Sequence, residues 1–361
     1  MTSTLGLRRE MRTTRALVAI LLLASLESLG LILPARAQQG RSAGAIGQTT
    51  VFARVPHPGQ PTGILVDGDT VYVSGAGFVT EPVDDWAVWA FDRRTGQPKA
   101  GETTRPARDM PVSFMGLTGM AKDAEGRLYV VDMNGRILRT TAGKRSWEVY
   151  AALPTHGMWP AGTMPTDMVF DSDGNAYVTD TNFPGIWRVS PGGSQVDLWF
   201  RDPRLLSYPL GSHGITLGPD RRDLYIAMCI SEQPDSPAQG IIYRLPVDTP
   251  DSSHFQEFFR YPPASCAVGL RFGNSGKLYV MLGAVNQVSV LRPDGREELR
   301  FPSRAENARQ EIPYDFPFMA SFDGEGSLLI TNSAATAPEH WAVLRAFVND
   351  TAFPLPEPFL P

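Results

Sequence analysis

The sequence predicts an all-β fold, a six-bladed β-propeller with four antiparallel strands in each blade. One sequence pattern recurs six times, its spacing is typical of propeller blades, and strand-like segments follow each copy. A solenoid of the same units would need polar end caps, and we find none in the sequence. The third positions of the copies are 56, 48, 47, 55 and 50 residues apart. These positions are Gly63, Gly119, Asp167, Gly214, Gly269 and Met319.

Each copy has the composition of a β-hairpin. A short apolar strand leads to a turn rich in Asp, Gly and Asn, and a second strand rich in Tyr, Val, Ile and Leu follows. The copies begin at Pro61, Leu117, Pro165, Ser212, Ala267 and Pro317. Third strands are predicted at residues 87–92, 135–140, 185–190, 240–246, 287–292 and 341–347. Fourth strands are predicted at residues 146–154, 195–203 and 255–263.

The two ends of the repeat region predict how the ring closes. Residues 49–56 look like a fourth strand but precede the first repeat, whereas the last repeat stops after its third strand. We therefore expect residues 49–55 to pair with residues 341–348 and to complete the last blade. Closure of this kind removes two exposed sheet edges, which would otherwise favour aggregation.

Residues 1–37 are predicted to be a signal peptide. Several arginines precede a mostly apolar run, and the small-x-small triplet at residues 35–37 is a cleavage signal. The alternative is a membrane anchor, but Glu27 leaves the apolar core short of the ~20 residues that span a bilayer. We expect residues 38–48 to be a flexible linker and residues 49–361 to be the propeller domain. The mature protein would then be secreted or periplasmic.

The charge of the predicted mature protein bears on its partners. The signal segment contains five Arg and two Glu, so 28 basic and 36 acidic residues remain. An acidic domain with no basic run has no electrostatic footprint for nucleic acid or for anionic lipid. We therefore expect no nucleic-acid partner and no membrane association after signal cleavage. We expect a monomer that binds a small molecule.

The repeat at residues 171–193, DSDGNAYVTDTNFPGIWRVSPGG, resembles an NHL-type propeller repeat. With the export signal, the six copies resemble the family of gluconolactonase, senescence marker protein and luciferin-regenerating enzyme, and more distantly strictosidine synthase. The resemblance covers residues 49–348 and rests on the motif x-G-[IL]-x-x-D…G-x-[LV]-Y-V. It implies activity on a small lactone or a similarly sized organic molecule at the mouth of the central channel.

Six residues at the starts of the first strands are predicted to surround that mouth: Thr62, Thr118, Thr166, His213, Val268 and Phe318. In the family that the chain resembles, Glu, Asn and Asp at such positions hold a divalent cation. Hydroxyl, imidazole and apolar side chains are poor substitutes, because a hard cation prefers charged or carbonyl oxygens. We therefore predict no metal and no cofactor.

His213 and Asp167 are the predicted catalytic residues. They belong to neighbouring repeats, and a carboxylate beside an imidazole can orient it and raise its basicity. We expect His213 to act as a general base, with Asp167 as its partner. The alternatives are that His213 caps the channel by a hydrogen bond to the backbone, and that Asp167 hydrogen-bonds to a turn or to the channel wall.

Loops that cross the same face are predicted to complete a ligand pocket. Aromatic residues above a few polar groups are typical of such pockets, although ordinary packing of the loops is the alternative. The loop residues are Trp159, Tyr208, Asp315 and Phe316, and Thr62, Thr118 and Thr166 would hold the polar groups of the substrate. His57, His254 and His340 fall in turns or loops and give no functional signal.

Cys229 and Cys266 are the only cysteines, and we expect them to form a disulfide because export would place them in an oxidising compartment. The alternative is two free thiols that line the pocket. Two functions remain open at this point. The first is a lactonase-like hydrolase or lyase without the usual calcium ligands, and the second is a non-catalytic propeller that binds a small molecule, a glycan or a protein.

Overall fold

The computed structural model describes residues 44–57, 59–76, 86–106, 116–141, 143, 146–154, 163–207, 210–231, 239–335 and 337–361. The chain divides into two compact units, Met1–Gly44 and Ala45–Pro361, and the fold described below is that of the second unit. The predicted signal peptide lies outside the described residues, as does part of the predicted linker. No helix in the described part is both long and apolar enough to cross a membrane.

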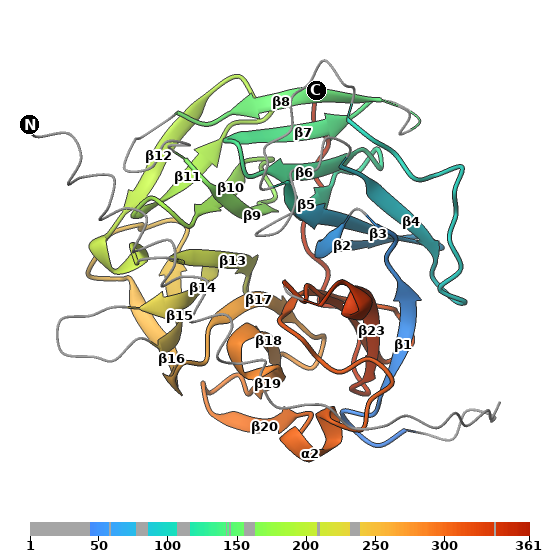
Figure 1. Ribbon diagram of the computed structural model, residues 1–361. Coiled ribbons are helices and arrows are strands. Elements are labelled where there is room, and N and C mark those ends of the chain that lie inside the picture. The colour runs from blue at the N-terminus through green and yellow to red at the C-terminus, as the bar shows by residue number, and fades with distance from the viewer. Residues whose placement is uncertain are drawn as a thin grey trace, which may run out of the picture. The chain divides into compact units, whose positions relative to one another are not determined.

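The second unit is a six-bladed β-propeller of antiparallel sheets, as predicted (Figure 1). Blade 1 contains β2 (Gln60–Asp67), β3 (Thr70–Ala76) and β4 (Val88–Asp92). Blade 2 contains β5 (Leu117–Lys122), β6 (Leu128–Asp132), β7 (Arg136–Thr140) and β8 (Trp147–Ala152). Blade 3 contains β9 (Pro165–Phe170), β10 (Ala176–Asp180), β11 (Gly185–Val189) and β12 (Val196–Arg201), and the 3-10 helix η1 (Pro203–Leu205) follows it.

The second half of the ring repeats this plan. Blade 4 contains β13 (Ser212–Leu217), β14 (Asp223–Ser231), β15 (Gln239–Pro246) and β16 (Gln256–Pro263). Blade 5 contains β17 (Ala267–Phe272), β18 (Leu278–Leu282), η2 (Gly283–Val285), β19 (Gln287–Leu291) and β20 (Glu297–Phe301), and the short helix α2 (Arg304–Asn307) follows it. Blade 6 contains β21 (Pro317–Phe322), β22 (Ser327–Asn332), η3 (Pro338–His340), β23 (Ala342–Phe347) and β1 (Thr49–Arg54).

The ring closes as the sequence predicts. Strand β1 pairs with β23 in antiparallel register, from Thr49 opposite Ala346 to Arg54 opposite Ala342. The innermost strands contact one another in the order β2, β5, β9, β13, β17 and β21, and β21 returns to β2. Blade 1 departs from the plan, since its described sheet has three strands. Residues 97–104 take the place of a fourth strand there through the isolated bridges of Val88 with Thr104 and Phe91 with Pro98.

Close contact between innermost strands explains the glycine in the repeated pattern. A Cβ atom on Gly63 would lie 1.9 Å from the carbonyl oxygen of Thr118, and one on Gly214 would lie 2.3 Å from that of Val268. Asp167 departs from the pattern, and its side chain occupies the space above Gly119, where a Cβ atom would lie 2.2 Å from Asp167 Oδ1. The glycines are therefore required by packing between the blades.

Hydroxyl groups on second strands also join neighbouring blades. Ser74 accepts a hydrogen bond from the amide of Gly63 and donates one to the carbonyl of Thr118. Thr331 repeats this arrangement, because it accepts from the amide of Met319 and donates to the carbonyl of Thr62 in the next blade. Such bonds satisfy buried backbone groups beside the channel, where they would otherwise be costly.

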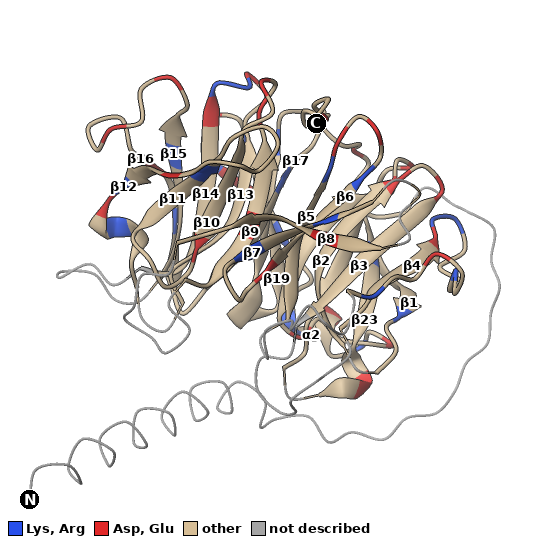
Figure 2. Ribbon diagram, turned by 90° about the horizontal axis from the view of Figure 1, so that it is seen from above, with Lys and Arg blue, Asp and Glu red and all other residues tan. Residues whose placement is uncertain are grey.

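The two ends of the ring differ in their connections. The innermost strands begin at the end that we call the mouth face and finish at the end that we call the underside. Residues 349–361, the C-terminal strap, run across the underside and contact blades 5, 4 and 2 in turn. Figure 2 shows Asp, Glu, Lys and Arg on several turns at the end of the ring where the C terminus lies, and on other segments as well.

Candidate functional site

The six predicted channel residues lie at the starts of the innermost strands, and all are buried. The exposed fraction of Thr62, Thr118, Thr166 and Val268 is 0%, and that of His213 and Phe318 is 1%. The threonine hydroxyls donate to backbone carbonyls: Thr62 to Leu117 at 2.7 Å, Thr118 to Val131 at 3.4 Å and Thr166 to Met164 at 3.4 Å. Their predicted role in binding substrate remains a prediction, and in this structure their protons are engaged within the protein.

His213 is held as a neutral imidazole. Its Nδ1 lies 3.1 Å from the carbonyl oxygen of Gly211 and 3.4 Å from the hydroxyl of Thr181. Because a carbonyl only accepts, Nδ1 carries the proton and Nε2 carries the lone pair. Burial lowers the pKa of His213 to about 4, although the bond to Gly211 opposes the shift. The imidazole is therefore uncharged at neutral pH and has a single defined basic nitrogen.

Asp167 is buried and bound to the backbone on both sides. Its Oδ1 accepts from the amide of Met168 at 2.9 Å, and its Oδ2 accepts from the amide of Ile215 in blade 4 at 3.1 Å. Burial raises the pKa of Asp167 to about 6, while the positive charge of Arg271 and the two amide donors act in the opposite direction. The carboxyl therefore links blades 3 and 4 and changes its protonation state in mildly acidic solution.

The structure brings His213 and Asp167 to neighbouring strands, β13 and β9, but the contacts of their polar atoms lie elsewhere. Both oxygens of Asp167 accept from amides, and Nδ1 of His213 faces Gly211 and Thr181. Each residue thus makes hydrogen bonds to the backbone, which is the structural role that the sequence left open as the alternative to catalysis. Their assignment as a catalytic pair stays a prediction.

An aromatic row connects His213 to the next part of the mouth. The ring centroids of His213 and Phe318 are 6.0 Å apart, and those of Phe318 and Phe316 are 6.3 Å apart. Cys229 and Cys266 form the predicted disulfide, which lies in the same apolar cluster as Phe318. Leu210, Ile230, Phe316 and Trp341 pack against this cluster and are partly exposed. The mouth is therefore predominantly apolar around the imidazole.

A second imidazole–carboxylate pair lies on the mouth face. Nδ1 of His340 is 3.0 Å from Oδ2 of Asp315, and the two side chains are 29% and 30% exposed. The hydrogen bond that His340 donates to Asp315 raises the pKa of His340 above its ordinary value. The sequence indicated Asp315 but not His340, because 25 residues separate them and no local pattern joins them. The only signal in the sequence is that Asp315 precedes β21 and His340 follows β22, so that both lie on connections that meet at the mouth.

Two further predicted pocket residues, Trp159 and Tyr208, lie outside the described residues. No group of three or more His, Cys, Asp or Glu that could hold a metal ion occurs among the residues that the structure describes. A cavity of about 360 Å³ lies on the underside of blades 1 and 2, away from the channel residues, and is lined by Asp67, Glu125, Gly126, Arg127, Thr141 and Gly143.

Solved structures share this fold at low sequence identity. The chain is similar to regucalcin, a calcium-binding protein from Agrobacterium tumefaciens strain C58, with a TM-score of 0.61 and 15% identity over 86% of this chain and 97% of that one. It is similar to a structure described as a gluconolactonase, with a TM-score of 0.57 and 16% identity over 85% and 94% of the chains. It is also similar to virginiamycin B lyase from Staphylococcus aureus, with a TM-score of 0.54 and 18% identity over 82% and 97%.

These likenesses establish the propeller fold alone, because unrelated activities occur on the same architecture. No protein-family model matches the chain. No curated protein sequence matches it either.

Proposed function

We propose that this protein is an exported hydrolase or lyase that acts on a small lactone-like molecule at the mouth of the channel, with His213 as the general base. The observation that carries the proposal is the neutral imidazole, whose proton is held on Nδ1 by the carbonyl of Gly211. A base must present a lone pair, and here Nε2 has it throughout the neutral pH range. In a hydrolysis, Nε2 would take a proton from water as the water oxygen attacks the ester carbonyl.

Structural neighbours support this class of activity. The similar propellers include a structure described as a gluconolactonase and a virginiamycin B lyase. A histidine-to-alanine variant of that lyase is described as catalytically inactive. These descriptions concern other proteins, and they make a histidine-dependent reaction on a propeller chemically reasonable.

The remaining residues of the proposed site have subordinate roles. Thr62, Thr118 and Thr166 would bind polar groups of the substrate after exchanging their backbone partners, and Asp315, Phe316, Trp159 and Tyr208 would line its approach. Asp167 would set the charge within the channel rather than orient His213, because its oxygens are bonded to amides. We propose export because the cysteines are bridged, and such bridges persist in oxidising compartments.

A second candidate function is non-catalytic binding of a small molecule, a glycan or a protein. The observation that favours it is the burial of the channel residues, with His213 only 1% exposed. A base enclosed in this way requires movement of its surroundings before a substrate can reach it. A binding protein would use only the partly exposed apolar residues at the mouth.

Lactone turnover separates the two candidates. We expect the domain of residues 38–361 to hydrolyse lactones in a pH-stat assay, and His213→Ala to lower kcat by about 100-fold or more. Replacement by Gln, with the unfolding temperature recorded, separates loss of the base from loss of packing. Activity should fall in acid with a pKa of about 4 and should survive EDTA. Ligand binding without turnover of any lactone or ester would favour the second candidate.

A further inference from the structure

The Asp315–His340 pair has the geometry of an oriented proton donor. Nδ1 of His340 faces Oδ2 of Asp315 at 3.0 Å, so the carboxylate fixes the ring and leaves Nε2 as the atom that can meet a ligand. Both side chains are partly exposed, in contrast to His213 and Asp167. A ligand can therefore contact this imidazole directly, whereas His213 becomes accessible only when its surroundings move.

The buried side chain of Asn332 positions both members of the pair. Its Oδ1 accepts from the amide of Asp315 at 2.7 Å, and its Nδ2 donates to the carbonyl of His340 at 3.0 Å. The same Nδ2 also donates to the carbonyl of Pro313 at 3.0 Å. One amide at the end of β22 thus ties together two connections of the mouth face. Such rigid support is what a proton-transfer group requires.

The surroundings of the pair supply two further features of a ligand site. Phe316 and Ala334 have φ angles of +53° and +44°, which are strained for residues with a Cβ atom. Between these connections lies Ser333, which is fully buried and whose Oγ has no hydrogen-bond partner in the described part of the chain. A buried hydroxyl without a partner is costly and would be satisfied by a polar ligand. The strained residues and Ser333 thus lie on the same two connections as the pair.

The charges around His340 come from three elements. Asp315 precedes β21, Glu339 belongs to η3, and Arg54 ends β1. The two carboxylates favour the protonated imidazole and Arg54 opposes it, but Arg54 is itself paired with Glu311 at 3.2 Å. Burial also lowers the pKa of His340, but the hydrogen bond to Asp315 outweighs it, and the net shift of the pKa is upward, toward the form that can donate a proton.

We propose that Asp315 and His340 form the proton-donating pair of the mouth face, in which His340 Nε2 protonates the ring oxygen that leaves when a lactone opens. This inference rests on the proposed function. Water adds to the carbonyl and gives a proton to His213, the bond between the acyl carbon and the ring oxygen breaks, and that oxygen takes the proton of His340. The product is a hydroxy acid, and the two histidines return to their starting states by exchange with solvent.

The chain offers a matched control for the pair. His254 and Asp251 form the same contact, with Nδ1 and Oδ2 2.6 Å apart, in a turn between β15 and β16 on the underside. Their side chains are 51% and 52% exposed. The control pair has the same chemistry at the opposite end of the ring, so His254→Gln should leave turnover and ligand responses unchanged.

The first test observes the imidazole directly and needs no turnover. We expect δ-valerolactam, an unreactive analogue of δ-valerolactone, to shift the Nε2 resonance of His340 in NMR spectra but not that of His254. Asp315→Asn should lower the pKa of His340 and weaken the response. If saturating lactam leaves the His340 resonance unmoved, the inference is overturned.

The second test uses δ-valerolactone turnover. We expect His340→Gln to lower kcat by about 100-fold and to abolish the alkaline limb of the pH profile, with KM little changed and the fold intact. If the wild type turns over the lactone and His340→Gln matches it, the inference is overturned while the proposed function stands. If the lactam shifts His340 but no lactone is turned over, the proposed function fails and the pair remains a ligand site.

Discussion

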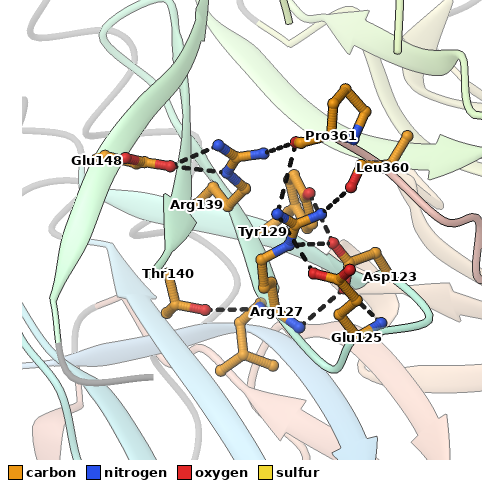
Figure 3. Close-up of polar contacts among 10 residues, drawn as sticks. Asp123, Glu125, Arg127, Tyr129, Arg139, Thr140, Glu148, Leu360 and Pro361 are labelled. Atoms are coloured by element: carbon orange, nitrogen blue, oxygen red, sulfur yellow. Dashed lines mark hydrogen bonds and ion pairs between the residues drawn. The ribbon is translucent and has the colours of Figure 1, made fainter. Parts of the chain in front are cut away.

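The mouth face and the underside of the propeller use their polar side chains in different ways. At the mouth, Asp167 and His213 are bonded to neutral backbone groups. On the underside, Arg127 and Arg139 pair with carboxylates of their own blade and donate hydrogen bonds to backbone carbonyls of the C-terminal strap (Figure 3). These arginines join the strap to blade 2, whereas the hydrogen-bond partners of Asp167 and His213 among the described residues are neutral. We therefore expect the underside to stabilise the ring through the strap, and the mouth to present titratable groups to a ligand.

The strap is held by both apolar and charged contacts. Leu360 is 5% exposed in the apolar cluster between blades 2 and 3, and its carbonyl accepts from Arg127 at 2.5 Å. Arg127 in turn contacts the buried Asp123 at 2.6 Å, and Arg139 donates to the carbonyl of Pro361 at 2.6 Å. A network of this kind fixes a segment that has no regular secondary structure of its own.

Removal of the strap should have the largest effect on stability. Deleting residues 349–361 exposes the sites of Phe353, Leu355 and Leu360, which pack on three different apolar clusters. Burial of each side chain contributes about 2 kcal/mol, which predicts a loss of roughly 6 kcal/mol and an unfolding temperature lower by about 10 °C. Scanning calorimetry would measure it, with Phe359→Ala, at an 85% exposed position, as the control. An unchanged transition would mean that the underside does not stabilise the ring.

The disulfide provides the corresponding test at the mouth. Replacing Cys229 and Cys266 by Ser opens a loop with a sequence separation of 37 residues. The chain-entropy description predicts a loss of about 4 kcal/mol. Urea unfolding of the oxidised protein and the double variant would measure this loss. A loss well above that of strap deletion would reverse the comparison between the two faces.

The two buried channel groups should change the unfolding free energy in opposite directions as the pH rises. This becomes visible when only one of them is present. The pKa of Asp167 is raised from 3.8 to about 6, so its stabilising contribution is complete below 3.8 and disappears as pH rises through 6. The pKa of His213 is lowered from 6.5 to about 4, so its contribution is present above 6.5 and disappears as pH falls through 4. In the wild type the two contributions largely offset each other.

Single variants remove this offset. Relative to the wild type, His213→Gln should lose about 3 kcal/mol of unfolding free energy between pH 4 and pH 7, and Asp167→Asn should gain about as much over the same range. Urea titrations across this interval would give both slopes. Parallel slopes in the two variants would contradict the assigned protonation states.

The smallest effect on stability should come from Arg139, which binds the end of the C-terminal strap. Arg139→Gln removes the bond to Pro361 and the ion pair with Glu148, whose side chain is 47% exposed. Solvent screens such a pair, so we expect a loss of about 1 kcal/mol in urea unfolding. Lactone turnover should be unaffected, because the residue lies on the underside. A loss of turnover without a loss of stability would connect the two faces.

Some features of the molecule could be predicted because they depend on residues close in sequence. The hairpin pattern of each repeat gave the strands, and the unpaired strand at residues 49–56 gave the closure with β23. The fourth strand of blade 5, β20, was not predicted, since Glu297–Phe301 is rich in charge and lacks the apolar pattern of the other blades. The pairing of the only two cysteines followed from elimination and redox environment.

The sequence by itself determined the number of blades, the order of their strands and the closure of the ring, because these depend on local periodicity and turn residues. Only the tertiary structure decided where polar atoms find their partners. It directed Asp167 to the amide of Ile215, joined Asp315 to His340, and bound the strap to Arg127. These contacts join residues far apart in sequence, and their geometry depends on how neighbouring blades pack, which no local pattern records.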